Sequence, residues 1–143
     1  MFTPSQHDVR RFFCVTFEKM EQGAVLTPLE SMAANWISQH KEYYFVLQNV
    51  DHALALDYSV EKGQENPFLH LAMHLSIAEQ ISINQPLGIL EAYRALVQKL
   101  NSEHLAYHQI MECLGEALWQ SQRSGLPLDE KKYIACILKR LGV

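Results

Sequence analysis

The sequence predicts an all-α fold, a single-domain antiparallel helical bundle of about six to seven helices over residues 1–143. Apolar residues recur at steps of three and four along almost the whole chain, which is the spacing of one helix face. Strand-like alternation bounded by hairpin dipeptides such as Asn-Gly or Asp-Gly is absent. Helix-start residues and short connections separate the periodic segments, as in an antiparallel bundle.

The first two helices have recognisable ends. Ser5 is a suitable cap for a helix that stops before Gly23. This helix has an apolar stripe at Val9, Phe12, Phe13, Thr16, Phe17 and Met20. Thr27, Pro28 and Glu30 form a capping box with proline at the first helical position, so a second helix is expected from Pro28 to His40.

The middle of the chain is less regular. Residues 42–56 include YYFVL, which suits a strand by propensity but has no partner strand in the sequence. Short helices are therefore expected there. Residues 57–66, DYSVEKGQEN, are polar and contain a glycine, which indicates an exposed loop.

Three longer helices and a final one follow. Asn66 and Pro67 begin a core helix that ends at Asn84, and the next helix is expected over residues 87–100. Asn101 or Ser102 then caps a long helix to about residue 123. After a break at Gly125 and Pro127, Asp129 caps a last helix through residue 138.

Composition narrows the function classes. The 143 residues are 48% hydrophobic, enough for the core of one ordinary domain. Acidic residues outnumber basic ones by 16 to 12, so no basic surplus is available for nucleic acid. No apolar stretch reaches the roughly 18 residues of a membrane span, and MFTPSQHDVRRFF lacks the apolar core of a signal peptide. A soluble cytoplasmic protein without a nucleic-acid or membrane partner is expected.

The three cysteines are Cys14, Cys113 and Cys136. An odd number without a CxxC pair argues against a disulfide framework and against a zinc ribbon. Free cysteine is among the most buried residue types, so all three are expected to be buried thiols.

Two histidine pairs share a spacing of four residues. HLAMH contains His70 and His74, and EHLAYH contains His104 and His108. On a helical wheel both pairs point inward with apolar residues. Imidazoles at this spacing stand about 5 to 6 Å apart at Cβ, close enough to bind one ion at about 2.0 to 2.1 Å. If the two helices face each other, the four imidazoles form a transition-metal site.

The chemistry of the candidate ligands limits which metal ion could bind. Imidazole suits several transition metals, and zinc or iron is expected first, because calcium and magnesium prefer oxygen ligands. No Glu-x-x-His occurs and HLAMH lacks the glutamate of HExxH, which disfavours a ferritin-like di-iron site and a zinc protease. Glu112 shares the face of the second pair and is a candidate ligand or proton acceptor, whereas Glu79 points away from the first pair. Catalytic residues, substrate and enzymatic activity stay open.

The same pairs have other interpretations. One is a non-enzymatic protein-interaction module with hydrogen-bonded core histidines and an exposed aromatic surface for a partner or a homodimer. Another is a pH-responsive core, because clustered imidazoles resist becoming charged together. Trp36 and Trp119 are most simply core residues. The histidines near helix ends or in polar contexts are expected at the surface: His7, His40 and His52.

Four segments resemble one known family across nearly the whole chain. They are MFTPSQHDVRRFF, LTPLE, NPFLHLAMHLSIAEQISINQPLGI and HQIMECLGEALWQSQRSG. The family is the bacterial domain of unknown function 1841. The resemblance implies a small bacterial cytoplasmic protein of no assigned activity, and it transfers no catalytic residue or substrate. The metal hypothesis therefore depends on histidine spacing alone.

Overall fold

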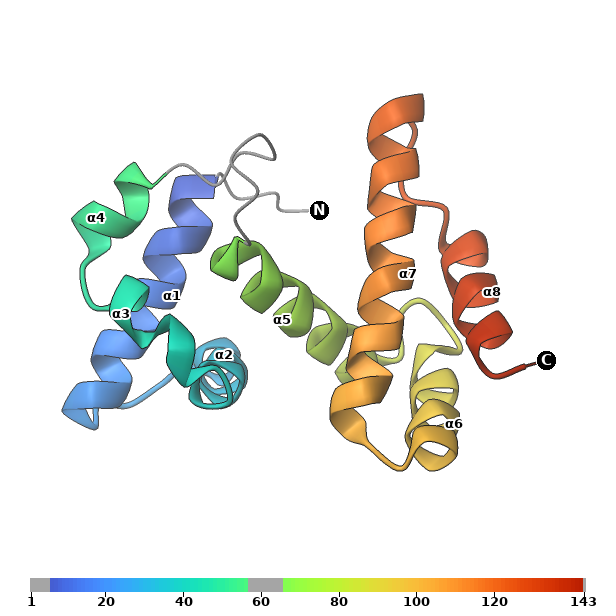
Figure 1. Cartoon of the computed structure of the whole chain (residues 1–143), viewed down its shortest axis with the longest axis horizontal. Coiled ribbons are helices and arrows are strands. Elements are labelled where there is room, and N and C mark those ends of the chain that lie inside the picture. Colours follow the sequence, from blue (N-terminus) through green and yellow to red (C-terminus); the bar gives the residue numbers. More distant parts are fainter. Residues whose placement is uncertain (1–5, 57–65, 143) are drawn as a thin grey trace. The chain divides into compact units, whose positions relative to one another are not determined.

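The computed structural model describes residues 6–56 and 66–142 (Figure 1). The chain divides into two compact units, Met1–Leu75 and Ser76–Val143. The predicted cap at Ser5 and the predicted loop at 57–65 lie outside the described residues. The predicted single domain stays a prediction.

The all-α prediction is confirmed, with eight α-helices and no strand in the described residues. Residues 42–56 form short helices, as expected, and these raise the number of helices above six to seven. The elements are α1 (Gln6–Gln22), α2 (Pro28–Ser38), the 3-10 helix η1 (Lys41–Tyr43), α3 (Tyr44–Leu47), α4 (Val50–Ala55), α5 (Pro67–Ile83), α6 (Ile89–Leu100), α7 (Glu103–Ser124) and α8 (Glu130–Arg140).

Four of the predicted N-terminal caps are confirmed, at Thr27, Asn66, Ser102 and Asp129. Thr27 accepts from the Glu30 N–H, and the Glu30 carboxylate accepts from the Thr27 N–H, which completes the capping box of α2. The side chains of Asn66, Ser102 and Asp129 accept backbone N–H groups in the first turns of α5, α7 and α8. These bonds satisfy N–H groups that have no partner within the helix itself.

Two predicted helix ends are shifted in the structure. α2 ends at Ser38 rather than at His40, because His40 leaves the helical region with φ −127° and ψ 64°. α6 begins at Ile89 rather than at residue 87, because Gly88 has a positive φ of 100°. The Asn84 side chain accepts from the N–H groups of Gly88 and Leu90 and closes this turn.

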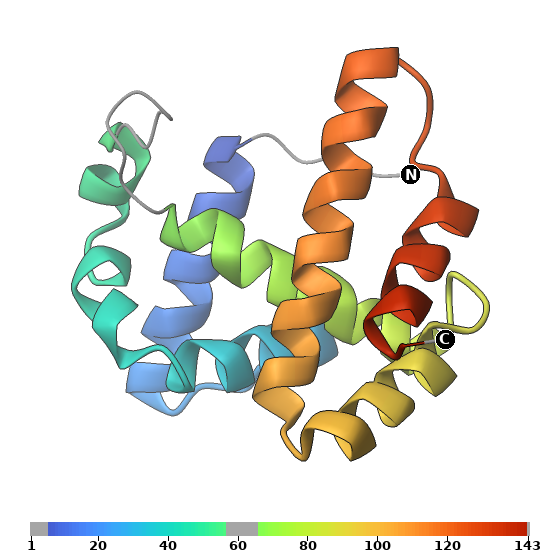
Figure 2. The ribbon, with the colours of Figure 1, turned by 45° about the vertical axis from the view of Figure 1, so that its right-hand side comes forward.

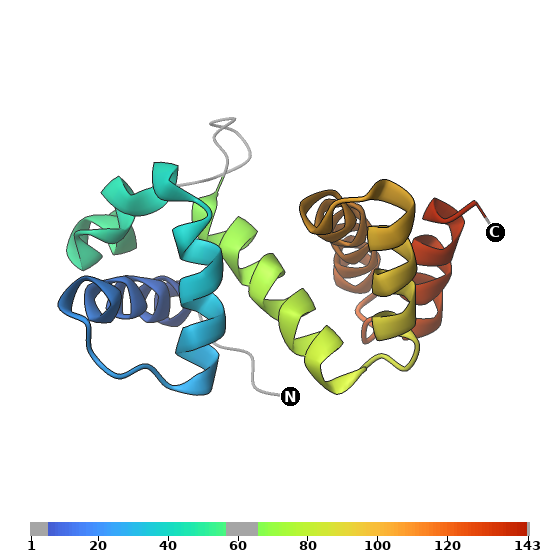
Figure 3. The same ribbon diagram turned by 90° about the horizontal axis from the view of Figure 1, so that it is seen from below.

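The first unit is built around α1. α1 contacts α2, α3 and α4, and Figure 3 shows α2 running across it. The largest core side chains here are Phe13, Phe17, Trp36, Ile37, Leu47, Phe68 and Leu71. Phe13 and Phe17 confirm that the apolar stripe predicted for the first helix faces the core.

The second unit contains α6, α7 and α8, which all contact one another. α7 and α8 run antiparallel and lie side by side in both Figure 1 and Figure 2. The largest core side chains are Ile77, Ile89, Leu96, Ile110, Leu114, Tyr133 and Ile137. The Tyr133 hydroxyl donates to the Gln80 side-chain oxygen at 2.7 Å, which links α8 to the end of α5.

The prediction of three free thiols is wrong for two of them. Cys113 of α7 and Cys136 of α8 form a disulfide, with their Cα atoms 5.8 Å apart. Antiparallel packing brings the two positions together, and sequence spacing alone does not reveal this. Cys14 is a buried free thiol, as expected, and burial raises its pKa.

The helices of the described residues include none that is long and apolar enough to cross a membrane.

Candidate metal centre

His70 and His74 lie one turn apart on α5, in the first unit. Their Nε2 atoms are 3.1 Å apart. His74 is completely buried and His70 is half-buried. The predicted pairing of these two imidazoles on one inward-facing stripe is therefore confirmed.

His40 joins the pair from another element. It follows the end of α2 and is only 6% exposed. Its Nδ1 lies 2.8 Å from the carbonyl oxygen of Trp36. A carbonyl oxygen can only accept, so Nδ1 carries a proton, and in the neutral form of the ring Nε2 is the nitrogen that presents a lone pair. A hydrogen bond of this kind orients most metal-binding histidines in proteins.

The three rings converge. The His40 ring centroid lies 5.0 Å from that of His70 and 5.3 Å from that of His74. One ligand atom from each of the three residues lies within 4.8 Å of the other two. Among the residues that the structure describes, His40, His70 and His74 form a group of three potential ligands that lie close enough together to hold one metal ion.

The distances suit a transition metal. Two nitrogens bound at about 2.0 to 2.1 Å to a tetrahedral ion lie about 3.4 Å apart. The 3.1 Å separation of the His70 and His74 nitrogens is close to this value. The third nitrogen needs an inward movement of about 1 to 1.5 Å, which side-chain rotation can supply.

Aromatic rings hold the imidazoles in place. Trp36 stacks on His74 with centroids 4.2 Å apart and an interplanar angle of 20°. Tyr43 stacks on His40 with centroids 5.2 Å apart and an angle of 6°. The potential ligand group contains no carboxylate, so these three neutral rings would leave a bound divalent ion with its full charge.

Comparison with known protein families shows which family the chain belongs to. The sequence profile of a family described as a domain of unknown function (DUF1841) matches residues 5–139. The chain belongs to the DUF1841 family. No curated protein and no solved structure was found to match it. The three histidines of the candidate centre lie within the part of the chain that the DUF1841 profile covers.

The second histidine pair of this DUF1841 chain lies in the other unit. His104 and His108 of α7 are neighbours, with ring centroids 4.2 Å apart. Glu112, one turn further on, is exposed and pairs with Arg140 of α8. The predicted four-imidazole site with Glu112 stays a prediction.

The expectation that both members of the second pair face inward is wrong for His104, which is exposed. The buried face of α7 contains Tyr107, Ile110 and Leu114. That face is centred about 100° from His104 on the helical wheel. Trp119 is likewise 49% exposed rather than a core residue, and the Arg123 guanidinium lies over its ring.

His40 was the residue that sequence reasoning missed. It was expected at the surface with His7 and His52, and those two are exposed as predicted. One signal was present, because His40 follows Trp36 by four residues at a helix end. A histidine there can donate to one of the last helix carbonyls, which draws its ring back over the helix.

Proposed function

We propose that this DUF1841 protein binds one transition-metal ion, zinc in the first instance, through His40, His70 and His74. The observation that carries the proposal is the convergence of the three imidazoles, with the Nε2 atoms of His70 and His74 3.1 Å apart. The ligand nitrogens are Nε2 of all three residues. His40 enters as a ligand in addition to the pair predicted from the sequence.

Burial supports metal binding. An imidazole buried in a fold must satisfy both a donor and an acceptor nitrogen, and two facing nitrogens can form a hydrogen bond only if one of them carries the proton. One ion accepts the lone pairs of all three rings at once. The competing interpretation is a hydrogen-bonded histidine core without metal, which is the arrangement expected of the interaction module.

The number of protein ligands, three, suggests a metal ion with one coordination position left open. Structural zinc sites have four protein ligands, whereas three histidines leave the fourth position to water or to an anion. A water bound there would be acidified by the ion. Zinc is proposed ahead of iron because neutral imidazoles alone suit its tetrahedral preference.

The larger metal site predicted from the sequence, which includes residues of α7, is an alternative form of this proposal. In that form the ligands of one ion would be His70, His74, His104 and His108, with Glu112 and without His40. The pair of histidines on α7 has the spacing needed to contribute two nitrogens. The two forms differ in which substitutions release the metal.

Metal analysis of tag-free protein tests the proposal. After equilibration with zinc and dialysis, the wild-type protein should retain about one zinc per chain. His70→Ala should retain less than a tenth of that amount. His70 is preferred over the fully buried His74 because its loss leaves a smaller gap in the core. The matched control is His52→Ala, which removes an exposed histidine.

The outcomes separate the interpretations. Wild-type protein that holds no zinc, iron, copper or nickel contradicts the proposal and favours the hydrogen-bonded core. Loss of metal from a His104→Ala, His108→Ala double variant supports the larger site, and full retention limits the site to the three histidines of the first unit. Circular dichroism spectra of each variant show whether the fold is kept.

A further inference from the structure

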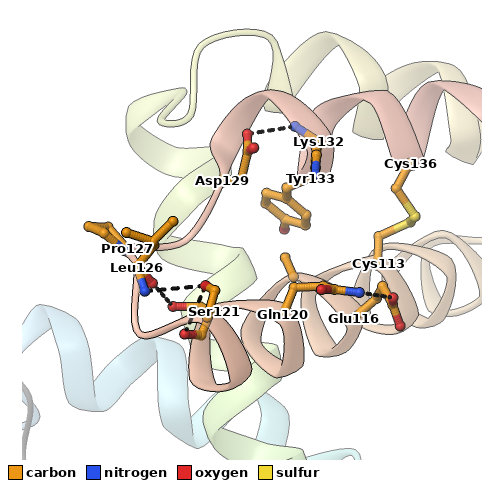
Figure 4. Close-up of a pocket in the computed structure, with 12 residues that line it drawn as sticks. Cys113, Glu116, Gln120, Ser121, Leu126, Pro127, Asp129, Lys132, Tyr133 and Cys136 are labelled. Carbon is orange, nitrogen blue, oxygen red and sulfur yellow. Dashed lines mark hydrogen bonds between the residues drawn. A yellow bond between two sulfur atoms is a disulfide. The ribbon is translucent and has the colours of Figure 1, made fainter.

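A cavity of about 360 Å³ lies in the second unit between α7, the connection after it and the start of α8 (Figure 4). Its volume is within the range of small-molecule sites in proteins. The disulfide between Cys113 and Cys136 forms part of its wall, and Tyr133 lies between the two helices. A sulfur pair in the wall of a cavity is open to chemistry that a fully enclosed disulfide cannot undergo.

The two sulfur-bearing residues differ in exposure. Cys113 is 1% exposed, whereas Cys136 is half-buried. Thiol–disulfide exchange begins when a thiolate attacks one sulfur along the line of the S–S bond, so access decides which sulfur is attacked. A thiolate that enters from solvent therefore reaches Cys136 first, and Cys113 is the leaving group.

The polar residues of the cavity indicate the kind of thiol. The residues that line the cavity include both charge signs, with the acidic Glu116 and Asp129 and the basic Lys132. Gln120 and Ser121 add neutral hydrogen-bonding groups. A zwitterionic thiol of di- or tripeptide size matches this mixture, because it carries a carboxylate for the lysine and an ammonium for the acidic side chains.

We propose that the Cys113–Cys136 disulfide is a reversible exchange site for a zwitterionic low-molecular-weight thiol bound in this cavity. The thiolate attacks Cys136 Sγ, a mixed disulfide forms and the Cys113 thiolate is released and takes up a proton. A second molecule of the same thiol attacks the mixed disulfide and releases Cys136. Overall, two thiols are oxidised to their disulfide, and the protein disulfide is reduced to two thiols by the same two electrons.

Single-cysteine kinetics test which sulfur is attacked. In a Cys14→Ser background, Cys113→Ser leaves only Cys136, and Cys136→Ser leaves only Cys113. With oxidised glutathione as the probe, Cys136 should form the mixed disulfide at least tenfold faster than Cys113, followed by intact mass. In concentrated urea the two rates should become equal. Equal rates in the native proteins, or a faster Cys113, overturn the proposal.

Reduction kinetics of the intact disulfide test the cavity without removing either cysteine. At equal thiolate concentration, reduced glutathione should reduce the wild-type protein several-fold faster than 2-mercaptoethanol, which has no carboxylate and no ammonium group. Lys132→Gln should remove this preference. Lys131→Gln is the matched control, because Lys131 is exposed on the same helix but does not line this cavity.

Two further results overturn the proposal. One is the absence of a rate preference between the two thiols in the wild-type protein. The other is purified protein whose mass after alkylation in denaturant shows Cys113 and Cys136 as free thiols even after exposure to oxidised glutathione. Because the disulfide and the histidine centre lie in different units, the metal content of the protein decides neither result.

Discussion

Arg10 of α1 donates from Nη1 to the carbonyl oxygen of Leu56 at 2.7 Å. The same nitrogen donates to the carbonyl of Ala53 at 2.9 Å, and the guanidinium lies over the Phe68 ring. Arg10 is only 6% exposed. One buried cation thus donates to carbonyl groups at the end of α4, where the last carbonyls of a helix have no N–H donor within the helix itself.

Arg10→Met should lower the free energy of unfolding by about 3 kcal/mol, because it leaves buried carbonyl groups without their charged donor. Urea denaturation followed by circular dichroism measures this change. Arg11→Met is the matched control, since Arg11 is the exposed neighbour on the same helix, and it should change stability by less than about 0.5 kcal/mol. Equal effects of the two substitutions would rule out this role for Arg10.

The capping box of α2 predicts that the stability of the protein falls in acid. The Lys19 ammonium and then the Thr27 N–H lower the pKa of Glu30 in the folded state. A lowered folded pKa gives stability that is complete above the usual glutamate range, about pH 4.5, and is lost as pH falls through the folded value. The melting temperature of wild-type protein should therefore fall more steeply below pH 4.5 than that of Glu30→Gln. Glu21→Gln, an exposed control, should keep the wild-type slope.

The buried hydroxyl of Tyr133 predicts that the stability of the protein falls at high pH. Burial raises the pKa of its hydroxyl, against a smaller lowering by the hydrogen bond to Gln80. A raised folded pKa gives stability that is complete below about pH 10 and is lost as pH rises further. Between pH 8 and 11, the melting temperature of Tyr133→Phe should fall less with rising pH than that of the wild-type protein. Burial also raises the pKa of Tyr93 and Tyr107, so a smaller loss should persist. A variant as alkali-sensitive as wild type would contradict this account.

Zinc should stabilise the folded protein if the histidine centre binds it. Free zinc at a hundred times the dissociation constant adds about 2.7 kcal/mol by mass action. The effect should disappear after chelation and should weaken as pH falls, because imidazoles must be deprotonated to bind a metal. Thermal melting with and without zinc measures it, with His70→Ala as the variant expected not to respond. A zinc-induced shift that persists in this variant would place the binding elsewhere.

Reduction of the disulfide should destabilise the second unit. Cys113 and Cys136 are 23 residues apart, and a loop of this size contributes about 3 kcal/mol when it is closed. Urea denaturation with and without a phosphine reductant should show this difference in the wild-type protein. A Cys113→Ser, Cys136→Ser double variant should show no response to the reductant. The Cys14→Ser variant should respond like the wild type, because Cys14 is a free thiol.

Much of the local structure was predictable from short segments. The Thr27–Glu30 capping box and the caps at Asn66, Ser102 and Asp129 were read directly from the sequence and are present in the structure. Such features depend on residues within one turn of each other. The spacing of His70 and His74 was predictable for the same reason.

The sequence by itself determined the all-α class, most helix ends and the pairing of His70 with His74. Only the tertiary structure placed His40 beside that pair, joined Cys113 to Cys136 and left His104 exposed on α7. Helical periodicity fixes the angle between residues of one helix, but not which face of that helix its neighbours cover. Contacts between helices are set by packing over the whole core, and for this reason the third histidine and the disulfide became visible only in the folded chain.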